Sequence, residues 1–188
     1  MQNLRQALMV TAVLAAVWAI GATPNKPGPV NAVHYETATL AGGCFWGLQE
    51  TLRQIPGVIK TTVGYTGGTP PNPTYEQVAG GKTGHAEAVE VVFDPARLSY
   101  DKLVADFLMA RNPTRLVTSA GRPHRAAIFY QDEGQRRTAE RVIGKINQSG
   151  KWSSPVVAEI NPAAKFYPAE EYQQNYLQKI SAGHACSF

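Results

Sequence analysis

The chain has 188 residues, of which 44% are hydrophobic and 17% are charged, which predicts one main domain and excludes both a disordered chain and a polytopic membrane protein. Two cysteines exclude a disulfide-dense scaffold and a four-cysteine zinc site. Eighteen Lys and Arg against fourteen Asp and Glu give a net charge of +4 without a basic run, so we expect no nucleic-acid partner. The four histidines show no metal-ligand spacing with either cysteine, so we expect no metal.

Residues 1–22 have the pattern of a secretory signal peptide. Arg5 precedes an apolar run from Ala7 to Ala22 that ends in small residues. This run is shorter than the roughly 20 apolar residues of a spanning helix. We therefore expect cleavage after Ala22 and a periplasmic or secreted protein without stable membrane association, the alternative being an uncleaved N-terminal membrane anchor. Residues 23–36 contain three prolines and no periodicity, which predicts a linker.

The rest of the chain, residues 37–188, is expected to form one alternating α/β domain. Strands are predicted from alternating apolar residues, and helices from apolar residues three and four positions apart. The expected strands are 37–41, 58–65, 86–93, 126–130 and 156–160, and the expected helices are 45–55, 100–110, 132–146 and 170–180.

This order of elements predicts a split βαβ, ferredoxin-like core. We expect a mixed sheet with helices on one face and a C-terminal extension. The glycines, prolines and asparagines after residue 66 predict a loop. The pattern also places Ile59 on the same face of its strand as Val63 and Tyr65, and Ala110 on the core side of its helix.

Cys44 stands in the segment GGCFWG, at the junction between a strand and a helix. The N–H groups and the dipole at a helix N-terminus favour the thiolate, which is the nucleophilic form of cysteine. The flanking glycines allow a substrate to approach the sulfur closely, and Phe45 and Trp46 could line an apolar pocket beside it. The alternative is a buried, inert cysteine; the glycine on each side of the aromatic pair argues against it.

Glu87 stands in the segment TGHAEA, at the start of a predicted strand. It has the same parity as Val89 and Val91, so it opens the apolar face of that strand. A carboxyl group that loses water there is expected to stay protonated near neutral pH. A neutral carboxylic acid can donate a proton as a general acid. The alternative is a glutamate at the end of a strand that turns toward solvent.

Two further residues complete the candidate site. Tyr65 ends its strand, where its hydroxyl could contact a bound oxygen, or it is a rim tyrosine with a solvated hydroxyl. Cys186, close to the C-terminus, suits a resolving cysteine that travels to Cys44, or a static Cys44–Cys186 disulfide. A nucleophilic thiol, an acid, a hydroxyl donor, an apolar pocket and a second thiol together suit thiol-based reduction of an oxygenated sulfur.

The segments GGCFWG, GYTGG…NPTYEQV and TGHAEAVEVVFDP resemble the peptide methionine sulfoxide reductase A family. The resemblance runs from about residue 39 to residue 176. It implies an α/β fold on a split βαβ core and the reduction of methionine S-sulfoxide, free or in proteins, without a cofactor. It also implies that thioredoxin or a similar dithiol reduces the disulfide that the reaction leaves.

The resemblance assigns a role to each candidate residue. Cys44 would be the nucleophile that becomes a sulfenic acid, and Glu87 would be the proton donor. Tyr65 would help to bind the sulfoxide oxygen. Phe45 and Trp46 would hold the substrate methyl group, and Cys186 sits about where the family has its resolving cysteine.

The sequence departs from the family after the second long helix, where residues 113–128 are shorter than PTxxNRQGxDxGxQYRSAI. Alignment on Arg125 places Ser119 at the family's active-site Asp and His124 at its second oxygen-binding Tyr. His124 can still donate a hydrogen bond, but Ser119 carries no charge. Tyr172 also stands where a His is usual.

We therefore expect an active monomer with reduced activity or altered substrate preference. One alternative is an impaired, secreted binding or structural domain on the same fold, with a permanent Cys44–Cys186 disulfide. Another is a thiol peroxidase, although no arginine neighbours Cys44 in the sequence to favour it.

Overall fold

The computed structural model describes residues 34–110 and 122–185, and the side chains of 182–185 are outside this description. The chain divides into two units, 1–32 and 33–188, and all described residues belong to the second. The predicted signal peptide, most of the predicted linker, Ser119 and Cys186 therefore lie outside the described residues. None of the helices within the described ranges is long and apolar enough to cross a membrane.

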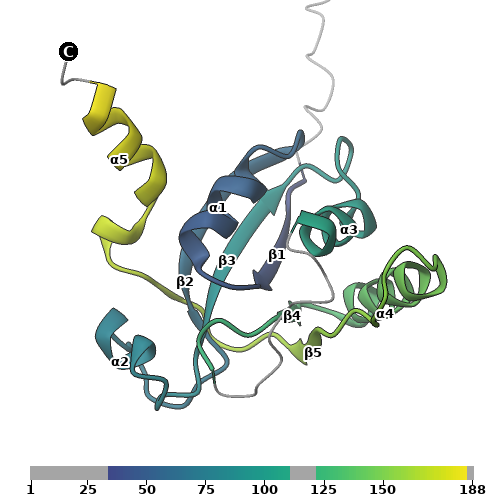
Figure 1. Ribbon diagram of the computed structural model, residues 1–188, viewed down its shortest axis with the longest axis horizontal. Helices are drawn as coiled ribbons and strands as arrows, with labels where there is room; N and C mark the ends of the chain where they lie inside the picture. The colour runs from purple at the N-terminus through teal and green to yellow at the C-terminus, as the bar shows by residue number, and fades with distance from the viewer. Residues whose placement is uncertain (1–33, 111–121, 186–188) are drawn as a thin grey trace, which may run out of the picture. The chain divides into compact units, whose positions relative to one another are not determined.

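Six strands form one mixed sheet in the order β5-β4-β1-β3-β2-β6 (Figure 1). Strand β3 is antiparallel to both β1 and β2, so β1 and β2 run parallel with β3 between them, and β4 is antiparallel to β1. These four strands form the predicted split βαβ core, to which β5 adds in parallel and β6 in antiparallel orientation. The strands are β1 (Glu36–Ala41), β2 (Val58–Thr66), β3 (Ala86–Phe93), β4 (Ala127–Tyr130), β5 (Glu159–Pro162) and β6 (Tyr167–Pro168).

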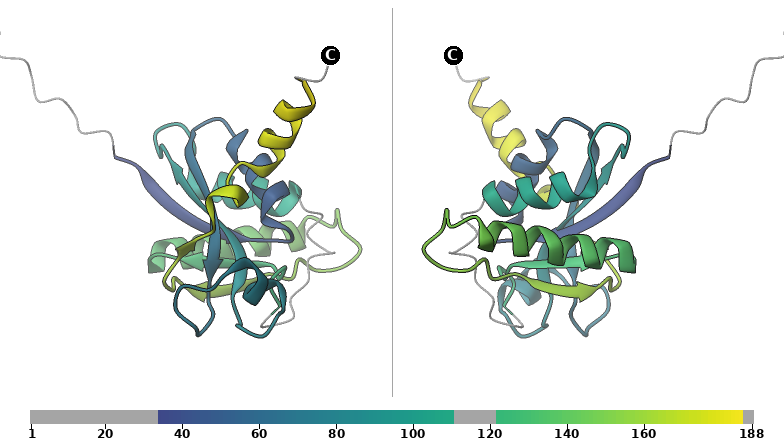
Figure 2. Two further views of the ribbon diagram at one scale, coloured as in Figure 1. Left: turned by 90° about the vertical axis from the view of Figure 1, so that its left-hand side faces the viewer. Right: turned by 90° about the vertical axis from the view of Figure 1, so that its right-hand side faces the viewer.

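The helices include three long ones that contribute to the core and a C-terminal one that begins beside α1. Helix α4 runs alongside α3, and the C-terminal end of α5 extends away from the sheet (Figure 2). The N-terminus of α4 is capped by Asp132, whose carboxylate accepts the N–H of Gln135 at 2.9 Å. The helices are α1 (Phe45–Arg53), α2 (Tyr75–Ala79), α3 (Tyr100–Ala110), α4 (Glu133–Gln148), the 3-10 helix η1 (Glu171–Gln173) and α5 (Tyr176–Ala185).

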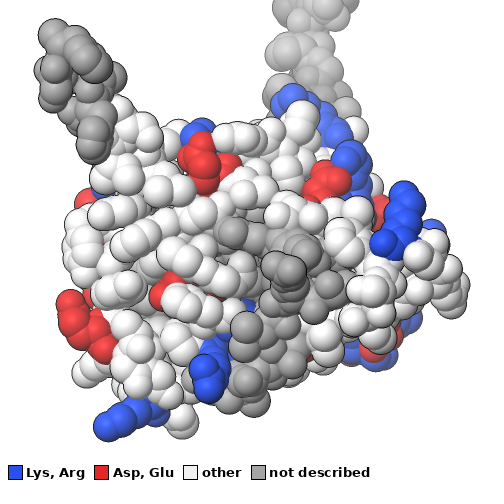
Figure 3. Space-filling model, viewed as in Figure 1, with Lys and Arg blue, Asp and Glu red and all other residues white. Residues whose placement is uncertain are grey.

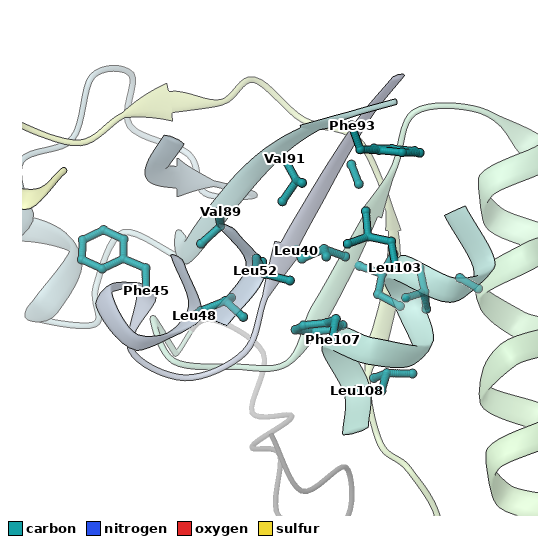
Figure 4. Packing of buried hydrophobic residues seen from close by; sticks show 14 of the residues in the cluster. Leu40, Phe45, Leu48, Leu52, Val89, Val91, Phe93, Leu103, Phe107 and Leu108 are labelled. Atoms are coloured by element: carbon teal, nitrogen blue, oxygen red, sulfur yellow. The ribbon is translucent and has the colours of Figure 1, made fainter. Parts of the chain in front are cut away.

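The main core lies between one face of the sheet and helices α1, α3 and α4, which confirms that the long helices share a face. Side chains of α1 and α3 point toward those of β1 and β3 (Figure 4). The opposite face of the sheet carries a second, smaller cluster, in which alanines pack with Phe129 and Phe166. Because α1 is fixed by this core, its N-terminus is held at a defined place over the sheet. The labelled core residues are Leu40, Phe45, Leu48, Leu52, Val89, Val91, Phe93, Leu103, Phe107 and Leu108.

A substitution in this core tests how much the packing of α3 contributes to stability. Phe107 is fully buried, so Phe107→Ala is expected to lower the free energy of unfolding by about 3–5 kcal/mol. Met109 on the same helix is 44% exposed, so Met109→Ala is expected to cost about 0.5 kcal/mol or less. Urea denaturation of both variants checks this, and equal losses would contradict the packing described here.

The predicted faces of two elements are partly wrong. Ala110 is exposed, and Val104 and Leu108 occupy the core side of α3 beside Leu103 and Phe107. Ile59 is also exposed, because a β-bulge between Val58 and Lys60 shifts the alternation before Val63.

Other differences concern short elements. The last long strand lies at 159–162 instead of 156–160, and the predicted loop after β2 contains the short helix α2. The two-residue strand β6 was not predicted, and the predicted helix 170–180 is divided into η1 and α5. Glu36, assigned to the linker, belongs to β1.

Candidate active site

Cys44 is the N-cap residue of α1, and its side chain is exposed. The alternative of a buried cysteine is therefore wrong, whereas the reactivity of Cys44 stays a prediction. Gly43 has a φ of +82°, a left-handed conformation that turns the chain from β1 into the helix and that residues with a side chain rarely adopt. Its N–H donates to the carbonyl oxygen of His124 at 3.2 Å. The thiol is thus presented at a helix N-terminus, beside the loop that precedes β4.

Glu87 is buried under this helix start, with 1% of its surface exposed. It stands opposite Tyr65 in the β2–β3 pairing. Its Oε2 accepts the backbone N–H of Phe45 at 3.1 Å, so one of the N–H groups left over at the start of α1 finds a partner. The predicted inward orientation of Glu87 is confirmed, and the solvent-facing alternative is wrong. A carboxyl group therefore lies directly behind the peptide that follows Cys44.

His124 is the second partner of Glu87. Its Nε2 lies 3.1 Å from Oε1 of Glu87, while 55% of the His124 side chain is exposed. The backbone fixes this approach, because the N–H of Glu87 donates to the carbonyl of Pro123 at 2.7 Å and the N–H of Gly43 donates to that of His124. The structure thus brings His124 against the carboxyl group of Glu87.

Tyr65 is fully buried, and its hydroxyl donates to Oε2 of Glu170 at 2.8 Å. Burial, and then the hydrogen bond to Glu170, raise the pKa of Tyr65 far above its ordinary value, so the hydroxyl stays protonated. Burial alone would raise the pKa of Glu170. Hydrogen bonds from its own backbone N–H, from that of Tyr75 and from the Tyr65 hydroxyl hold the pKa below its usual range instead. Tyr65 is therefore not a rim tyrosine with a solvated hydroxyl.

An aromatic cluster adjoins the thiol. The rings of Phe45 and Tyr65 have centroids 5.8 Å apart, and Tyr75 stacks at 6.4 Å from both Phe45 and Trp46. Tyr176 stacks on Trp46 at 3.9 Å. The indole N–H of Trp46 donates to Oε1 of Gln173 at 2.6 Å, which fixes the ring. Phe45 and Trp46 thus belong to one aromatic cluster beside Cys44, and their role in binding a substrate stays a prediction.

Residues 169–176, here called the C-terminal strap, cross the outer edge of β2. Gln174 pairs with Val63 as a neighbouring strand would: its Oε1 accepts the Val63 N–H at 3.0 Å and its Nε2 donates to the Val63 carbonyl at 2.9 Å. Gln49 of α1 donates to a backbone carbonyl of β2 at 3.3 Å and accepts a backbone N–H of the strap at 2.8 Å. These bonds therefore hold the strap in place, together with its residues that bond to Tyr65 and Trp46, namely Glu170 and Gln173.

Tyr75, Glu170, Gln173 and Tyr176 received no role from the sequence. Tyr75 lies near both Cys44 and Glu87: burial, then the charges of Glu87 and Cys44, raise its pKa. A signal for α2 was present, because Thr74 and Gln77 form a capping box. The strap residues show no local signal, since their contacts join residues far apart in the chain.

Charged residues of both signs are spread over one face of the domain. On the face shown in Figure 3, the described acidic and basic residues are scattered instead of gathering into one basic patch. Within residues 34–110 and 122–185, no three His, Cys, Asp or Glu side chains are placed to hold a metal ion. A cavity of about 560 Å³ lies beside His124, lined also by Ala79, Gly81, Arg122 and Pro123.

Comparisons with known proteins agree with this geometry. The family model described as "Peptide methionine sulfoxide reductase" matches residues 36–188. "Peptide methionine sulfoxide reductase MsrA" of Leifsonia xyli subsp. xyli is 46% identical over 156 residues, which cover 81% of this chain and 90% of that protein. The protein of the same name from Pseudomonas fluorescens is 46% identical over 82% of this chain and 74% of its own length.

Solved structures are similar as well. Methionine sulfoxide reductase A of Corynebacterium diphtheriae matches with a TM-score of 0.64 and 33% identity over 82% of this chain and 76% of that chain. Mxr1 of Saccharomyces cerevisiae in reduced form matches with a TM-score of 0.69 and 29% identity, over 81% of this chain and 90% of that chain. The family model matches residues 36–188, which is nearly all of the described domain, and the relatives align over most of their own length. This chain belongs to the peptide methionine sulfoxide reductase family.

Proposed function

We propose that this enzyme reduces methionine S-sulfoxide to methionine, with Cys44 as nucleophile and Glu87 as proton donor. The observation that carries the proposal is an exposed thiol at the start of α1 with a buried carboxyl group hydrogen-bonded to the next peptide N–H. The Cys44 thiolate attacks the sulfoxide sulfur, and the sulfur–oxygen bond breaks. This attack forms a bond between the two sulfurs, and the departing oxygen takes a proton from Glu87 and leaves as hydroxide. The hydroxide then adds to the Cys44 sulfur, the sulfur–sulfur bond breaks and methionine is released. Two electrons have then passed from the Cys44 sulfur to the substrate sulfur, and Cys44 is a sulfenic acid.

The aromatic cluster would bind the substrate methyl group through Phe45 and Trp46. Tyr65 would donate a hydrogen bond to the sulfoxide oxygen. Because its hydroxyl carries one proton, which Glu170 accepts at 2.8 Å, Tyr65 must turn from Glu170 to do so. His124, on the exposed side of Glu87, would offer a second polar contact to the same oxygen.

Cys186 would resolve the sulfenic acid. Its thiol attacks the Cys44 sulfur, water leaves, and a Cys44–Cys186 disulfide forms. A thioredoxin-like dithiol would then reduce this disulfide. A solved structure holds yeast Mxr1 in complex with Trx2, and reduced Mxr1 resembles this chain, which supports a reductant of that class.

Residues 1–22 support a proposal about the place of action. We propose that they are a signal peptide cleaved after Ala22, so that a monomeric enzyme acts in the periplasm or outside the cell and protects proteins there from methionine oxidation. The apolar run and its small-residue end support this. Intact-mass analysis of exported protein checks it, since a mass that begins at Met1 would contradict cleavage.

The reaction is tested by incubating the purified protein with each epimer of methionine sulfoxide and dithiothreitol, and by quantifying methionine. We expect turnover of the S epimer alone. No turnover of either epimer by folded, reduced protein would favour the binding or structural alternative with a permanent disulfide. Faster turnover of hydrogen peroxide than of methionine sulfoxide would favour the peroxidase alternative.

A further inference from the structure

We propose that Arg122 is a specificity residue, which binds a carboxylate of the substrate in the cavity next to His124. The inference rests on the proposed function and names the class of substrate that the same site prefers. Two sources can supply the carboxylate. One is the α-carboxylate of a free or C-terminal methionine sulfoxide, and the other is an Asp or Glu side chain next to the sulfoxide in a peptide.

The cavity begins at the groups that surround the proposed acid. Nε2 of His124 lies 3.1 Å from Oε1 of Glu87, and the carbonyl of Pro123 accepts the Glu87 N–H at 2.7 Å. His124 and Pro123 also line the cavity. Its volume of about 560 Å³ is typical of ligand pockets, which range from roughly 300 to 1,000 Å³. A substrate that places its oxygen at Glu87 therefore has a cavity of suitable size beside it.

Helix α2 connects the aromatic cluster to this cavity. Tyr75, at the start of α2, stacks on Phe45 and Trp46, and Ala79, at its end, lines the cavity. Four residues of helix span about 6 Å, which is less than two residues of extended chain. A sulfoxide sulfur carries an oxygen, a methyl group and the chain that leads to the backbone. With the methyl group at the aromatic cluster, the backbone beside the sulfoxide can reach the cavity.

Arg122 gives this cavity its charge. The other residues that line it are Ala79, Gly81, Pro123 and His124, none of which is acidic. Arg122 is exposed, and it takes part in none of the ion pairs within residues 34–110 and 122–185. A guanidinium group keeps its charge, and its planar set of donors matches the two oxygens of a carboxylate. A carboxylate is therefore the group that this cavity fits best.

The neighbouring charges single out Arg122. Lys82 is exposed as well, but the second cavity that it lines, of about 450 Å³, is also lined by Glu76. Glu87 lies behind His124 with 1% of its surface exposed. Gly81 leaves room for a ligand, since a Cβ built there would have no other atom within 4 Å. A carboxylate in the cavity of Arg122 would thus meet a cation for which no lining acid competes.

Pairs of substrates that differ by one carboxylate test the preference. For the first source, N-acetyl-methionine S-sulfoxide is compared with its methylamide. For the second, tripeptides are compared in which Asp or Asn precedes or follows the sulfoxide. In at least one pair the carboxylate should raise kcat/KM about fivefold, as expected for a partly exposed ion pair, and that pair identifies the source. The preference should shrink in about 0.5 M salt, which screens such a pair. Equal kcat/KM values within every pair would overturn the proposal.

Charge variants show whether Arg122 causes the preference. Arg122→Gln should bring the ratio of kcat/KM within the pair close to one, and Arg122→Glu should reverse it in favour of the uncharged member. The loop should keep its shape, because Arg125 bonds to the backbone carbonyl of Arg122 and not to its side chain. A purely structural role would slow both members of the pair equally. An unchanged ratio in both variants would therefore overturn the proposal.

Arg97→Gln is the matched control for these variants. Arg97 is also exposed, and it follows the end of β3, whereas Glu87 stands at the start of that strand. This variant should keep the full preference for the carboxylate. An equal loss of the preference in Arg97→Gln would assign the effect to the net charge of the protein and overturn the role of Arg122.

Binding separates this inference from the proposed function. Cys44→Ser lacks the nucleophile, so dissociation constants for the same pairs can be measured in it by calorimetry. The carboxylate member should bind about fivefold more tightly, and adding Arg122→Gln should remove the difference. Turnover without a carboxylate preference in rate or in binding would overturn the inference and keep the reaction. Preferential binding without turnover by the unmodified enzyme would keep the carboxylate site and reject the reaction.

Discussion

Cys44→Ser is expected to abolish methionine sulfoxide reduction while leaving the protein at least as stable as the unmodified chain. The thiol is exposed at the N-cap of α1, and its side chain makes no capping hydrogen bond. Serine is among the preferred N-cap residues, because its hydroxyl accepts an N–H of the first turn, and such a cap is worth about 1 kcal/mol. A serine hydroxyl at this position cannot form the sulfenic acid. Loss of activity and gain of stability should therefore come together.

Two measurements separate these effects: methionine formed per enzyme molecule, and the midpoint of thermal unfolding. Cys186→Ser serves as the matched control, since it changes the other cysteine in the same way. That variant should still form one equivalent of methionine without added reductant, whereas Cys44→Ser should form none. Turnover by Cys44→Ser would show that Cys44 is not the nucleophile.

Glu87→Gln is expected to slow formation of the first equivalent of methionine by about 10²- to 10⁴-fold, the range for loss of a general acid. The amide oxygen of glutamine can still accept the Phe45 N–H, so the start of α1 keeps its partner. What the variant lacks is the transferable proton. The change should therefore appear in the rate of the chemical step, with little change in the stability of the fold.

Glu90→Gln is the control for this prediction, because Glu90 lies on the same strand and is half-buried. It should leave the rate within about twofold of the unmodified enzyme, as expected for a substitution outside the site. The rate of His124→Ala provides the ordering test. If His124→Ala loses more activity than Glu87→Gln, the assignment of Glu87 as the acid is wrong.

The elements with strong periodicity could be predicted closely from the sequence. Strand β3 and helix α3 have the predicted bounds, because each carries a complete apolar pattern and ends at a turn signal. Helix α2 and strand β6 were missed, since five and two residues are too short to show a period. Ile59 was misplaced because a bulge changes parity within one strand, and nothing in the local sequence indicates the bulge.

In the candidate site, too, some features could be predicted from the sequence and others could not. The inward orientation of Glu87 could be read from the parity of its strand, and the exposure of Cys44 from the glycines around it. The contact between Glu87 and His124 joins residues 37 positions apart, and that between Tyr65 and Glu170 joins residues 105 apart. Such pairs depend on how β3, β2 and the loops meet in space. Residue types and spacing alone do not fix them.

The glutamines that border β2 also protect the enzyme from its surroundings. Strand β2 pairs with the short β6 at Gly64 and Tyr65, and within residues 34–110 and 122–185 no other strand lies along its outer edge. An open edge recruits other extended chains and leads to aggregation. By occupying the amide and carbonyl groups of Val63, Gln174 denies this edge to a foreign strand. An extended chain that approaches this edge would thus find the backbone groups of Val63 already occupied.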